Sequence, residues 1–522
     1  MRQVQHRITT LLFIAAAAGL SLGSGQTGLC QAKHSVPNII LVLADDLGYG
    51  DIRCLNPIHG KIPTPHVDRL AAQGIVFSDA HSGSSVCSPT RYGILTGRYA
   101  WRTSLQSGVL RPPDGPLIAP ERLTLPGLLT RNGYQTACIG KWHLGWNWPH
   151  EGKKVAFDHP IADGPTTRGF RYFFGMAAPD WPPYGFVEND RMLVQPTAWC
   201  QPRPKDLILS LGGPMVPGWQ FDQILPTLAE KAVEYIGRRG AEKKPFFLYL
   251  ALTSPHEPIA PSAQFRGKSG ISPLADFIME TDWAAGRVLE ALEKNGLADN
   301  SLVIFTADNG HSPYTGLGPL LRAGHLPSQR FRGYKSDIWE GGHRIPFVAR
   351  WPGRVKAGGR CEQLICLTDL MATCAELLGA KLPDNAGEDS VSILPALQGL
   401  SGPRHEAVVH HSCDGRFSLR QGNWKLELCP GSGGYGGRPS DTEAVRKGLP
   451  PVQLYDMSRD DVEKTNLERE HAEVVRRLTR LLEDYVTRGR STPGEPQKND
   501  VPVNIWKHGP QQSSLRPIEP QA

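Results

Sequence analysis

Four short apolar runs, each ending abruptly in polar residues, constrain the fold of this chain more than any other feature of its sequence. Near-continuous apolar runs are typical of strands buried on both faces, as in a mostly parallel sheet with helices on each side. Helical patterns occupy the intervals, for example over 226–239 and 277–295. The sequence therefore predicts an α/β fold with a large, mostly parallel sheet sandwiched by helices. The four runs cover residues 38–44, 134–140, 246–252 and 302–307.

Each run delivers charged or imidazole side chains at its carboxyl end. Ligands of open α/β sheets bind at that edge, so we expect these groups to converge. The alternative for any single group is a polar strand terminus at the surface, but four such ends together favour a site. The groups are Asp45 and Asp46, Lys141 and His143, His256, and Asp308 with Asn309.

Two of these ends are rich in carboxylate and amide oxygens. Asp45 and Asp46 adjoin after the first run, and Asp308 and Asn309 follow the fourth. Hard oxygen ligands select calcium or magnesium over zinc. Three carboxylates placed together without a cation would repel one another, so the sequence predicts a bound divalent cation. The alternative is that each carboxylate caps a following helix.

The pattern changes after about residue 400. Short strand-like segments surround a Gly-rich loop over 431–437, which predicts a small antiparallel sheet. A helix follows, and its apolar stripe is expected to pack against that sheet. The stripe consists of Val474, Leu478, Leu481, Leu482 and Tyr485. We therefore predict a large α/β domain over 36–400, a small α+β subdomain over 401–490 and a Pro-rich tail over 491–522 that is extended or disordered.

The N-terminus has the features of an export signal. Arg2 and Arg7 precede an apolar stretch over 8–22 and then small residues over 23–28, a pattern typical of a secretory signal peptide. The stretch is shorter than the roughly 20 residues that span a membrane, and the residues before Cys30 do not fit a lipid anchor. We expect a signal peptide over about 1–32 and an exported protein, periplasmic or secreted, with no membrane attachment after cleavage.

Cysteine spacing and charge exclude some function classes. The ten cysteines include no Cys-x-x-Cys pair, which argues against a zinc ribbon or a redox motif. Some could pair as disulfides in an oxidising compartment, whereas Cys138 lies in an apolar run and is expected to be a buried thiol. The net charge of +6 is spread without long basic runs, so no nucleic-acid partner is indicated.

The segment from Cys87 to Arg91 precedes a helix-like stretch, with Pro89 near its first turn. A group at Cys87 would face the positive end of that helix, which is a natural site for an anion. As a plain thiol, Cys87 could be a nucleophile with a lowered pKa. The pattern Cys-x-Pro-x-Arg resembles the core signature of type I sulfatases, in which the cysteine is converted to formylglycine.

Further segments resemble the same family in the same order. The stretch from Gly133 to His143 looks like the second sulfatase signature, and the similarity spans roughly residues 36–400. The other matches are Ala44-Asp45-Asp46, Ser254-Pro255-His256, Ala307-Asp308-Asn309-Gly310, and Lys335 ahead of Glu340-Gly341-Gly342. The chain is thus similar to the arylsulfatase and N-acetylgalactosamine-6-sulfatase branch of the alkaline phosphatase superfamily, whose fold it implies.

The resemblance implies a metal centre and a modified nucleophile. Calcium, with magnesium as the less favoured ion, would be held by Asp45, Asp46, Asp308, Asn309 and the formylglycine made from Cys87. The hydrated aldehyde would attack sulfur through one hydroxyl, activated by Asp308. Modification would require a formylglycine-generating enzyme as a partner.

The resemblance also implies roles for the remaining site residues. His256 and Lys335 would protonate or stabilise the leaving oxygen. His143 would remove the proton from the second hydroxyl, so that sulfate is eliminated and the aldehyde returns. Arg91 and Lys141 would orient the nucleophile and neutralise the sulfate oxygens.

The function that the resemblance implies is release of sulfate from a sulfate ester, with a sulfated sugar or glycan as the expected substrate. Four aromatic residues could stack on sugar rings or simply pack in loops: Trp146, Trp148, Trp181 and Tyr184. Two alternatives remain, a phosphonate or phosphate ester hydrolase of the same superfamily and an inactive protein that binds sulfated glycans. The presence of Cys87 and of all the metal ligands disfavours the inactive protein.

Overall fold

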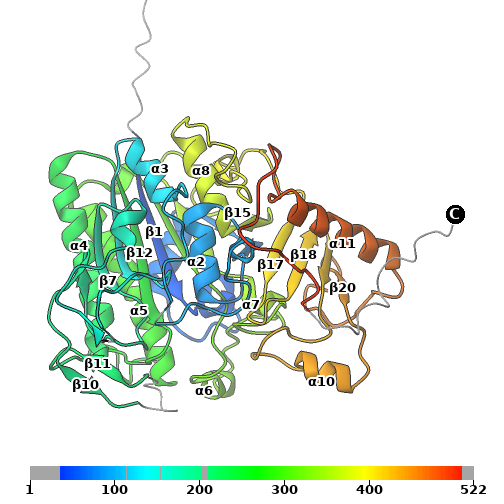
Figure 1. The fold of residues 1–522 in the computed structure, drawn as a ribbon, viewed down its shortest axis with the longest axis horizontal. Coiled ribbons are helices and arrows are strands. Elements are labelled where there is room, and N and C mark those ends of the chain that lie inside the picture. The colour runs from blue at the N-terminus through cyan, green and yellow to red at the C-terminus, as the bar shows by residue number, and fades with distance from the viewer. Residues whose placement is uncertain (1–35, 113, 153, 203–209, 508–522) are drawn as a thin grey trace, which may run out of the picture. The chain divides into compact units, whose positions relative to one another are not determined.

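The computed structural model describes residues 36–112, 114–152, 154–202 and 210–507. The predicted signal peptide lies outside these residues. A ten-stranded sheet forms the centre of the molecule (Figure 1), in the order β15, β2, β14, β13, β1, β12, β4, β7, β8, β9. Its strands are β1 (Asn38–Asp45), β2 (Ile75–Phe77), β4 (Gln135–Lys141), β7 (Tyr172–Met176), β8 (Val187–Glu188), β9 (Arg191–Met192), β12 (Phe246–Pro255), β13 (Ser301–Ala307), β14 (Phe347–Arg350) and β15 (Gly359–Cys361).

The four apolar runs are the four adjacent central strands β13, β1, β12 and β4, and they are parallel to one another. Every residue of β1, β12 and β13 is buried, which explains the continuous apolar pattern. In register, Ala44 lies opposite Ala307, Leu43 opposite Ala251, and Ala251 opposite Gly140. The polar residues that follow therefore reach the same edge of the sheet.

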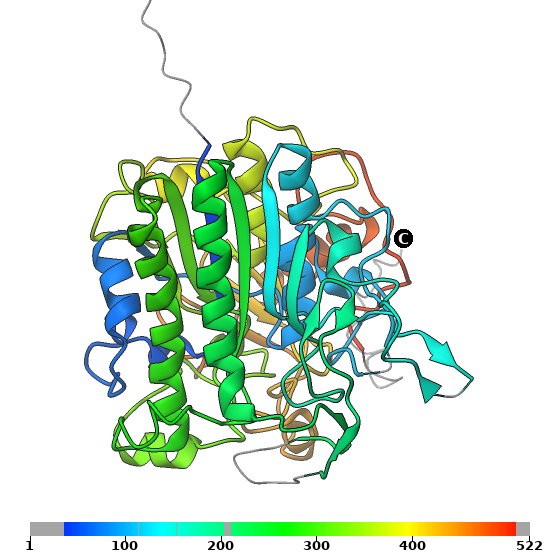
Figure 2. The ribbon, with the colours of Figure 1, turned by 90° about the vertical axis from the view of Figure 1, so that its left-hand side faces the viewer.

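Helices cover both faces of the sheet. The two long helices α4 (Ile224–Glu242) and α5 (Pro273–Lys294) contain the predicted helical patterns and pack together on one face, as Figure 2 shows. Helices α2 (Cys87–Thr96), α3 (Leu125–Arg131) and α8 (Leu370–Leu377) pack together on the other face, and α1 (Pro65–Ala72) contacts α5. The predicted α/β sandwich is confirmed. Shorter helices are α6 (Leu317–Arg322), α7 (Glu340–His343) and α9 (Leu394–Leu397).

A second, four-stranded antiparallel sheet follows in the C-terminal part of the chain, as predicted. Its strands are β17 (Val408–His411), β18 (Phe417–Gln421), β19 (Trp424–Glu427) and β20 (Gln453–Asp456), and the short helix α10 (Asp441–Arg446) lies between the last two. Helix α11 (Ala472–Thr487) buries its apolar stripe against this sheet, although Leu481 is only half-buried. We call residues 408–487 the C-terminal subdomain. By its contacts, the chain from Val36 onward is one compact unit.

The start of the Pro-rich tail is packed on the large domain, not disordered. Two buried arginines of the large domain hold it. Arg98 donates hydrogen bonds to the carbonyl of Lys498 at 3.0 Å and to the carboxylate of Asp500, and Arg102 donates to Asn499 Oδ1 at 3.0 Å. Buried guanidinium groups need such partners, and this requirement orders residues 491–507.

The remaining strands form short pairs. They are β3 (Ala80–His81) with β16 (Ile365–Cys366), β5 (His150–Glu151) with β6 (Lys154–Val155), and β10 (Ala198–Cys200) with β11 (Gly213–Met215). The nine cysteines in the described residues are free thiols, and Cys138 is buried as predicted. Within the same residues, no helix combines the length and apolar character that crossing a membrane requires.

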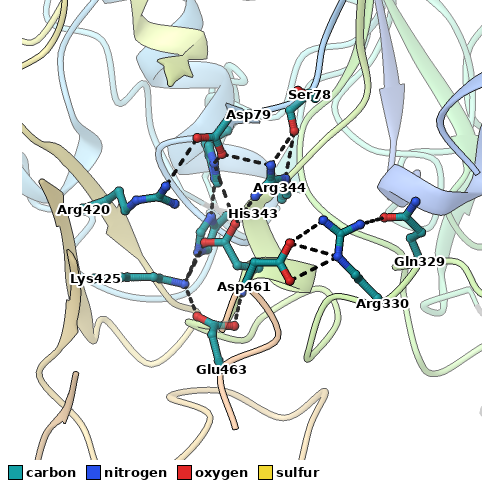
Figure 3. A network of polar contacts seen from close by, with 12 residues as sticks. Ser78, Asp79, Gln329, Arg330, His343, Arg344, Arg420, Lys425, Asp461 and Glu463 are labelled. Atoms are coloured by element: carbon teal, nitrogen blue, oxygen red, sulfur yellow. Dashed lines mark hydrogen bonds and ion pairs between the residues drawn. The ribbon is translucent and has the colours of Figure 1, made fainter. Parts of the chain in front are cut away.

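A network of buried charged and imidazole groups joins the two sheets (Figure 3). Lys425 on β19 pairs with Glu340 of α7 at 3.1 Å and with Glu463, and Arg420 on β18 approaches Asp79 at 3.5 Å. The pairs of Lys425 with Glu340 and of Arg420 with Asp79 cross from the C-terminal subdomain to the large domain, whereas Glu463 belongs to the subdomain itself. We call the network the inter-sheet cluster; its members are Asp79, His81, Glu340, His343, Arg344, His410, Arg420, Lys425 and Glu463.

Candidate active site

The carboxylates at the ends of β1 and β13 meet, as the strand register requires. Asp46 adopts a left-handed backbone conformation, with φ of 65°, directly after β1. Its backbone N–H donates to Asp308 Oδ1 at 3.1 Å, and Asn309 Nδ2 donates to Asp46 Oδ1 at 2.8 Å. Asp45, Asp46, Asp308 and Asn309 are all buried. The turn after β1 thus brings both aspartates beside the residues that follow β13.

The donor set fits a hard divalent cation. Asn309 Oδ1 is buried and has no hydrogen-bond partner among the described residues, so the amide that contacts Asp46 has an acceptor to spare. The ligand atoms of Asp45, Asp46, Cys87 and His256 lie within 4.8 Å of one another. The carboxylates of Asp45, Asp46 and Asp308 and the amide of Asn309 would supply oxygen ligands, which suit calcium or magnesium.

Cys87 is the first residue of α2, and its thiol points at the two aspartates. The Sγ atom lies 3.6 Å from Asp45 Oδ1 and 4.0 Å from Asp46 Oδ1. Burial raises the pKa of the thiol well above its ordinary value, and Asp308 and Asp45 add to the rise against the opposing charges of Lys141 and Lys335. These surroundings therefore disfavour a plain thiolate at Cys87.

Buried basic side chains pair with each of the three carboxylates. Lys141 Nζ donates to Asp45 Oδ2 at 2.7 Å, and Lys335 Nζ donates to Asp46 Oδ2 at 2.7 Å. Arg91, on the turn of α2 after Cys87, donates through Nε and Nη2 to Asp308 Oδ2 at 3.0 and 2.7 Å. The sequence-predicted cations therefore all lie around Cys87.

These contacts separate the pKa values of two of the carboxyls. Burial would raise the pKa of Asp45, but Lys141, His256, Arg91 and Lys335 together hold it well below its ordinary value. Burial and the nearby charge of Asp45 raise the pKa of Asp308 to about 6, although Arg91 opposes the rise. Like charges in one buried site produce such a split.

His143 and His256 lie in this cluster with different tautomers. His143 Nε2 lies 3.2 Å from the carbonyl of Leu110, and its Nδ1 is buried without a partner among the described residues. Burial, Lys141 and Arg91 hold the pKa of His143 well below its ordinary value. Its Nε2 therefore carries the proton and its Nδ1 is a free base.

His256 has the opposite arrangement. Its Nδ1 donates to the carbonyl of Glu257 at 2.6 Å, and its Nε2 lies 3.7 Å from Asp46 Oδ2. Burial, Lys335 and Lys141 would lower the pKa of His256, but Asp46 and Glu257 outweigh them and raise it. This imidazole is suited to donating a proton.

The four aromatic residues expected near the substrate separate in the structure. Trp181 packs edge to face on His143, with ring centroids 4.7 Å apart. Trp146 and Trp148 pack on each other, and the Tyr184 hydroxyl donates to the carbonyl of Asp180 at 2.6 Å. Only Trp181 of these four contacts a candidate site residue through its ring within the described part of the chain. Sequence reasoning did not find the Leu110 carbonyl, because a backbone acceptor leaves no residue signature.

Comparisons with known proteins cover this whole site. The family model described as Sulfatase matches residues 37–380. An N-acetylgalactosamine-6-O-sulfatase of Bacteroides thetaiotaomicron is 34% identical, with 87% of this chain and 93% of that protein covered. Human arylsulfatase A is 32% identical, with 87% of this chain and 86% of the human protein covered. A solved Bacteroides thetaiotaomicron structure concerned with glycosaminoglycan metabolism has a TM-score of 0.76 at 32% identity, covering 86% of this chain and 99% of that one.

Proposed function

This chain belongs to the sulfatase family, and from that premise we propose that it releases sulfate from a sulfated sugar or glycan with a formylglycine made from Cys87. The observation that carries the proposal is the position of Cys87 at the start of α2, 3.6 Å from Asp45. The family match contains every candidate site residue. The thiol of Cys87 marks the place where the oxygen atoms of the modified residue would lie.

The surroundings of Cys87 suit a sulfate ester. Lys141, Lys335 and Arg91 are buried there, and the N-terminal end of α2 adds partial positive charge. Preorganised cations of this kind stabilise the charge that develops on sulfate oxygens in the transition state. We assign Arg91 and Lys141 to orienting the nucleophile and the sulfate.

We propose that Asp45, Asp46, Asp308 and Asn309 hold a calcium ion, with magnesium as the less favoured alternative. The unpartnered Oδ1 of Asn309 and the three buried carboxylates support this assignment. Such an ion supplies Lewis-acid polarisation of a sulfate oxygen. Formylglycine supplies an aldehyde hydrate, which can attack sulfur and later release sulfate while the aldehyde is restored.

We assign the proton transfers to four residues around Cys87. Asp308 accepts the proton of the attacking hydroxyl, and the free Nδ1 of His143 accepts the proton that must leave before sulfate is released. His256 and Lys335 both lie against Asp46 Oδ2 and donate to the leaving oxygen. The sugar, as the leaving group, therefore lies on the side of Lys335.

The substrate proposal starts from the relatives. An N-acetylgalactosamine-6-O-sulfatase is 34% identical to this chain, so N-acetylgalactosamine 6-sulfate is the first sugar to test. Trp181, beside His143, is a half-buried aromatic surface of the kind that sugars contact. A matched phosphate ester serves as the control for the phosphohydrolase alternative.

The experiment combines mass analysis with sulfate release. The peptide that contains Cys87 should lose about 18 mass units on conversion of the thiol to an aldehyde. The modified protein should release sulfate from the sulfated sugar far faster than phosphate from its phosphate analogue, and a chelator should stop release until calcium is restored. Modified protein that prefers the phosphate ester would reject the sulfate assignment.

We also propose that the mature protein is exported, on the strength of residues 1–32. Cell fractionation tests this directly. When the full-length gene is expressed, the chain without its leader should appear in the periplasm or medium, and a variant with Arg2→Glu and Arg7→Glu should remain inside the cell. Equal distribution of both forms would contradict export by this segment.

A further inference from the structure

Two exposed tyrosines stack on each other beside the proposed active site. Tyr314 and Tyr435 have ring centroids 4.7 Å apart and planes 22° apart, and their side chains remain 63% and 37% exposed. Aromatic rings that are exposed and held in place offer an apolar face to a ligand. We call this pair the aromatic platform.

The two rings come from distant parts of the chain. Tyr314 lies five residues after Asn309, in the loop that follows β13. Tyr435 lies in the Gly-rich loop of the C-terminal subdomain, beyond residue 380, where the family match ends. One ring thus belongs to the metal-ligand edge of the large sheet, and the other is contributed by the small subdomain.

Lys335 connects the platform to the reacting groups. The backbone N–H of Tyr435 donates to the hydroxyl of Ser336 at 2.9 Å, and Lys335 Nζ reaches Asp46 Oδ2. Tyr435 therefore lies in the loop that packs on the residue next to Lys335, and the Tyr314 ring stacks on it.

The Gly-rich loop holds Tyr435 in a defined place. Gly436 N–H donates to Ser336 Oγ and to Asp337 Oδ1, each at 3.0 Å. A Cβ at Gly434 would lie 2.3 Å from the carbonyl oxygen of Ser336, and one at Gly436 would lie 2.7 Å from that of Lys335. The glycines allow the loop to lie directly on residues 335–337. A ring held this way loses little conformational entropy when it binds a ligand.

The inter-sheet cluster fixes the subdomain that carries this loop. Its ion pairs, Lys425 with Glu340 and Arg420 with Asp79, cross between the two sheets (Figure 3). The backbone adds a direct link, because Ile338 N–H donates to the carbonyl of Ser432 at 2.7 Å. The platform is therefore preorganised on a rigid base.

We propose that the aromatic platform binds the sugar ring next to the sulfated one in an oligosaccharide substrate. This inference rests on the proposed function, since it takes Lys335 to mark the leaving-group side. The sulfated ring must lie over the buried charges around Cys87, whereas the platform is exposed at the rim and meets the following ring. Tyrosine faces suit the C–H faces of a sugar.

The test compares a sulfated monosaccharide with a sulfated trisaccharide as substrates. The probes are N-acetylgalactosamine 6-sulfate and a trisaccharide that ends in the same residue. In Tyr314→Ala and Tyr435→Ala, we expect kcat/KM for the trisaccharide to fall about tenfold, the size of an aromatic contact. The monosaccharide should stay within about twofold of wild type. Tyr314→Phe and Tyr435→Phe keep the rings and should match wild type on both probes.

Binding without turnover separates the platform from the chemistry. Titration calorimetry on the Cys87→Ala protein should show tighter binding of the trisaccharide than of the monosaccharide, and Tyr435→Ala in that background should remove the difference. If wild-type protein releases no sulfate but this difference exists, the proposed function fails and the platform stands. Equal binding of both probes, or equal losses on both in the alanine variants, overturns the platform.

Discussion

The molecule contains two buried clusters of acids, lysines and histidines, one around Cys87 and one between the sheets. In the first, Asn309 Oδ1 and His143 Nδ1 are buried without partners among the described residues, and a thiol lies between carboxylates. In the second, His410 Nε2 is likewise buried without a partner among the described residues, but no thiol is present and the charged groups pair between the subdomain and the large domain. The comparison shows that burial and charge alone do not mark a catalytic site.

Ring geometry sharpens the difference. The inter-sheet histidines His81, His343 and His410 place nitrogens within 4.8 Å of one another. However, His343 and His410 stack, with centroids 3.9 Å apart and planes 14° apart. Nitrogen lone pairs lie in the ring plane, so stacked rings do not direct them at one ion. Lys425 Nζ also lies 3.1 Å from His343 Nε2. The cluster around Cys87 suits a hard cation. The inter-sheet cluster joins the C-terminal subdomain to the large domain.

The largest effect on activity is expected when the Cys87 side chain is removed from the first cluster. Cys87→Ala should lower sulfate release by roughly a thousandfold or more, because the only candidate for the modified nucleophile is removed. Its unfolding free energy should stay near the wild-type value, since a small buried side chain is exchanged for a smaller one. Activity assays and urea denaturation on the same preparation check both parts. Turnover near the wild-type rate would refute the formylglycine assignment.

The second cluster should show the reverse behaviour. Lys425→Met leaves Glu340, Glu427 and Glu463 without their shared cation, and removing one partner from a buried ion network costs about 3–5 kcal/mol. Urea denaturation measures the loss. At a temperature where the variant is folded, kcat on the monosaccharide should remain within a few-fold of wild type. A stable variant with lost activity would mean that the cluster takes part in the chemistry.

The site was predictable from the sequence because each of its residues ends an apolar run or lies in a recognisable motif. Asp45, Lys141, His256 and Asp308 all follow such runs, and parallel strands bring those ends together. The inter-sheet cluster was not predictable, because its members come from strands and loops that share no spacing pattern. The contact of His343 with Lys425, for example, depends on how the two sheets dock.

The packing of loop residues was also predicted less well, because it depends on contacts between segments that share no spacing pattern. Trp146 and Trp181 look alike as sequence features, yet one packs on Trp148 and the other on His143. Prolines at the end of the chain indicated an extended segment, but only the buried arginines Arg98 and Arg102 show why it packs. Such outcomes depend on contacts between residues distant in sequence.

Low pH should reduce the unfolding free energy through the inter-sheet cluster, and His410 is expected to contribute to this reduction. Burial, together with His343, His81 and Lys425, holds the pKa of His410 well below its ordinary value against the opposing effect of Glu340. The unfolded chain then binds more protons than the folded one below about pH 6.5. Stability is full above that pH and falls as the pH drops, by up to about 1.4 kcal/mol per pH unit for one such group.

His410→Phe keeps a stackable ring but cannot be protonated. The slope of unfolding free energy against pH, measured by urea denaturation between pH 5 and pH 7, should be shallower in this variant than in wild type. His66, half-buried on α1, provides a comparison outside the cluster, and His66→Phe should change the slope less. Parallel slopes for wild type and His410→Phe would contradict the assignment of acid sensitivity to this histidine.

The smallest effect is expected at the edge of the same network. Arg330 donates to the carboxylate of Asp461 beside the inter-sheet cluster (Figure 3), but the two side chains are 54% and 30% exposed. Solvent screens such a pair, so Arg330→Gln should change the unfolding free energy by less than about 1 kcal/mol. Urea denaturation beside Lys425→Met measures the contrast. If both variants lost the same stability, burial would not be what makes the inter-sheet contacts strong, and the distinction between the cluster and its rim would fail.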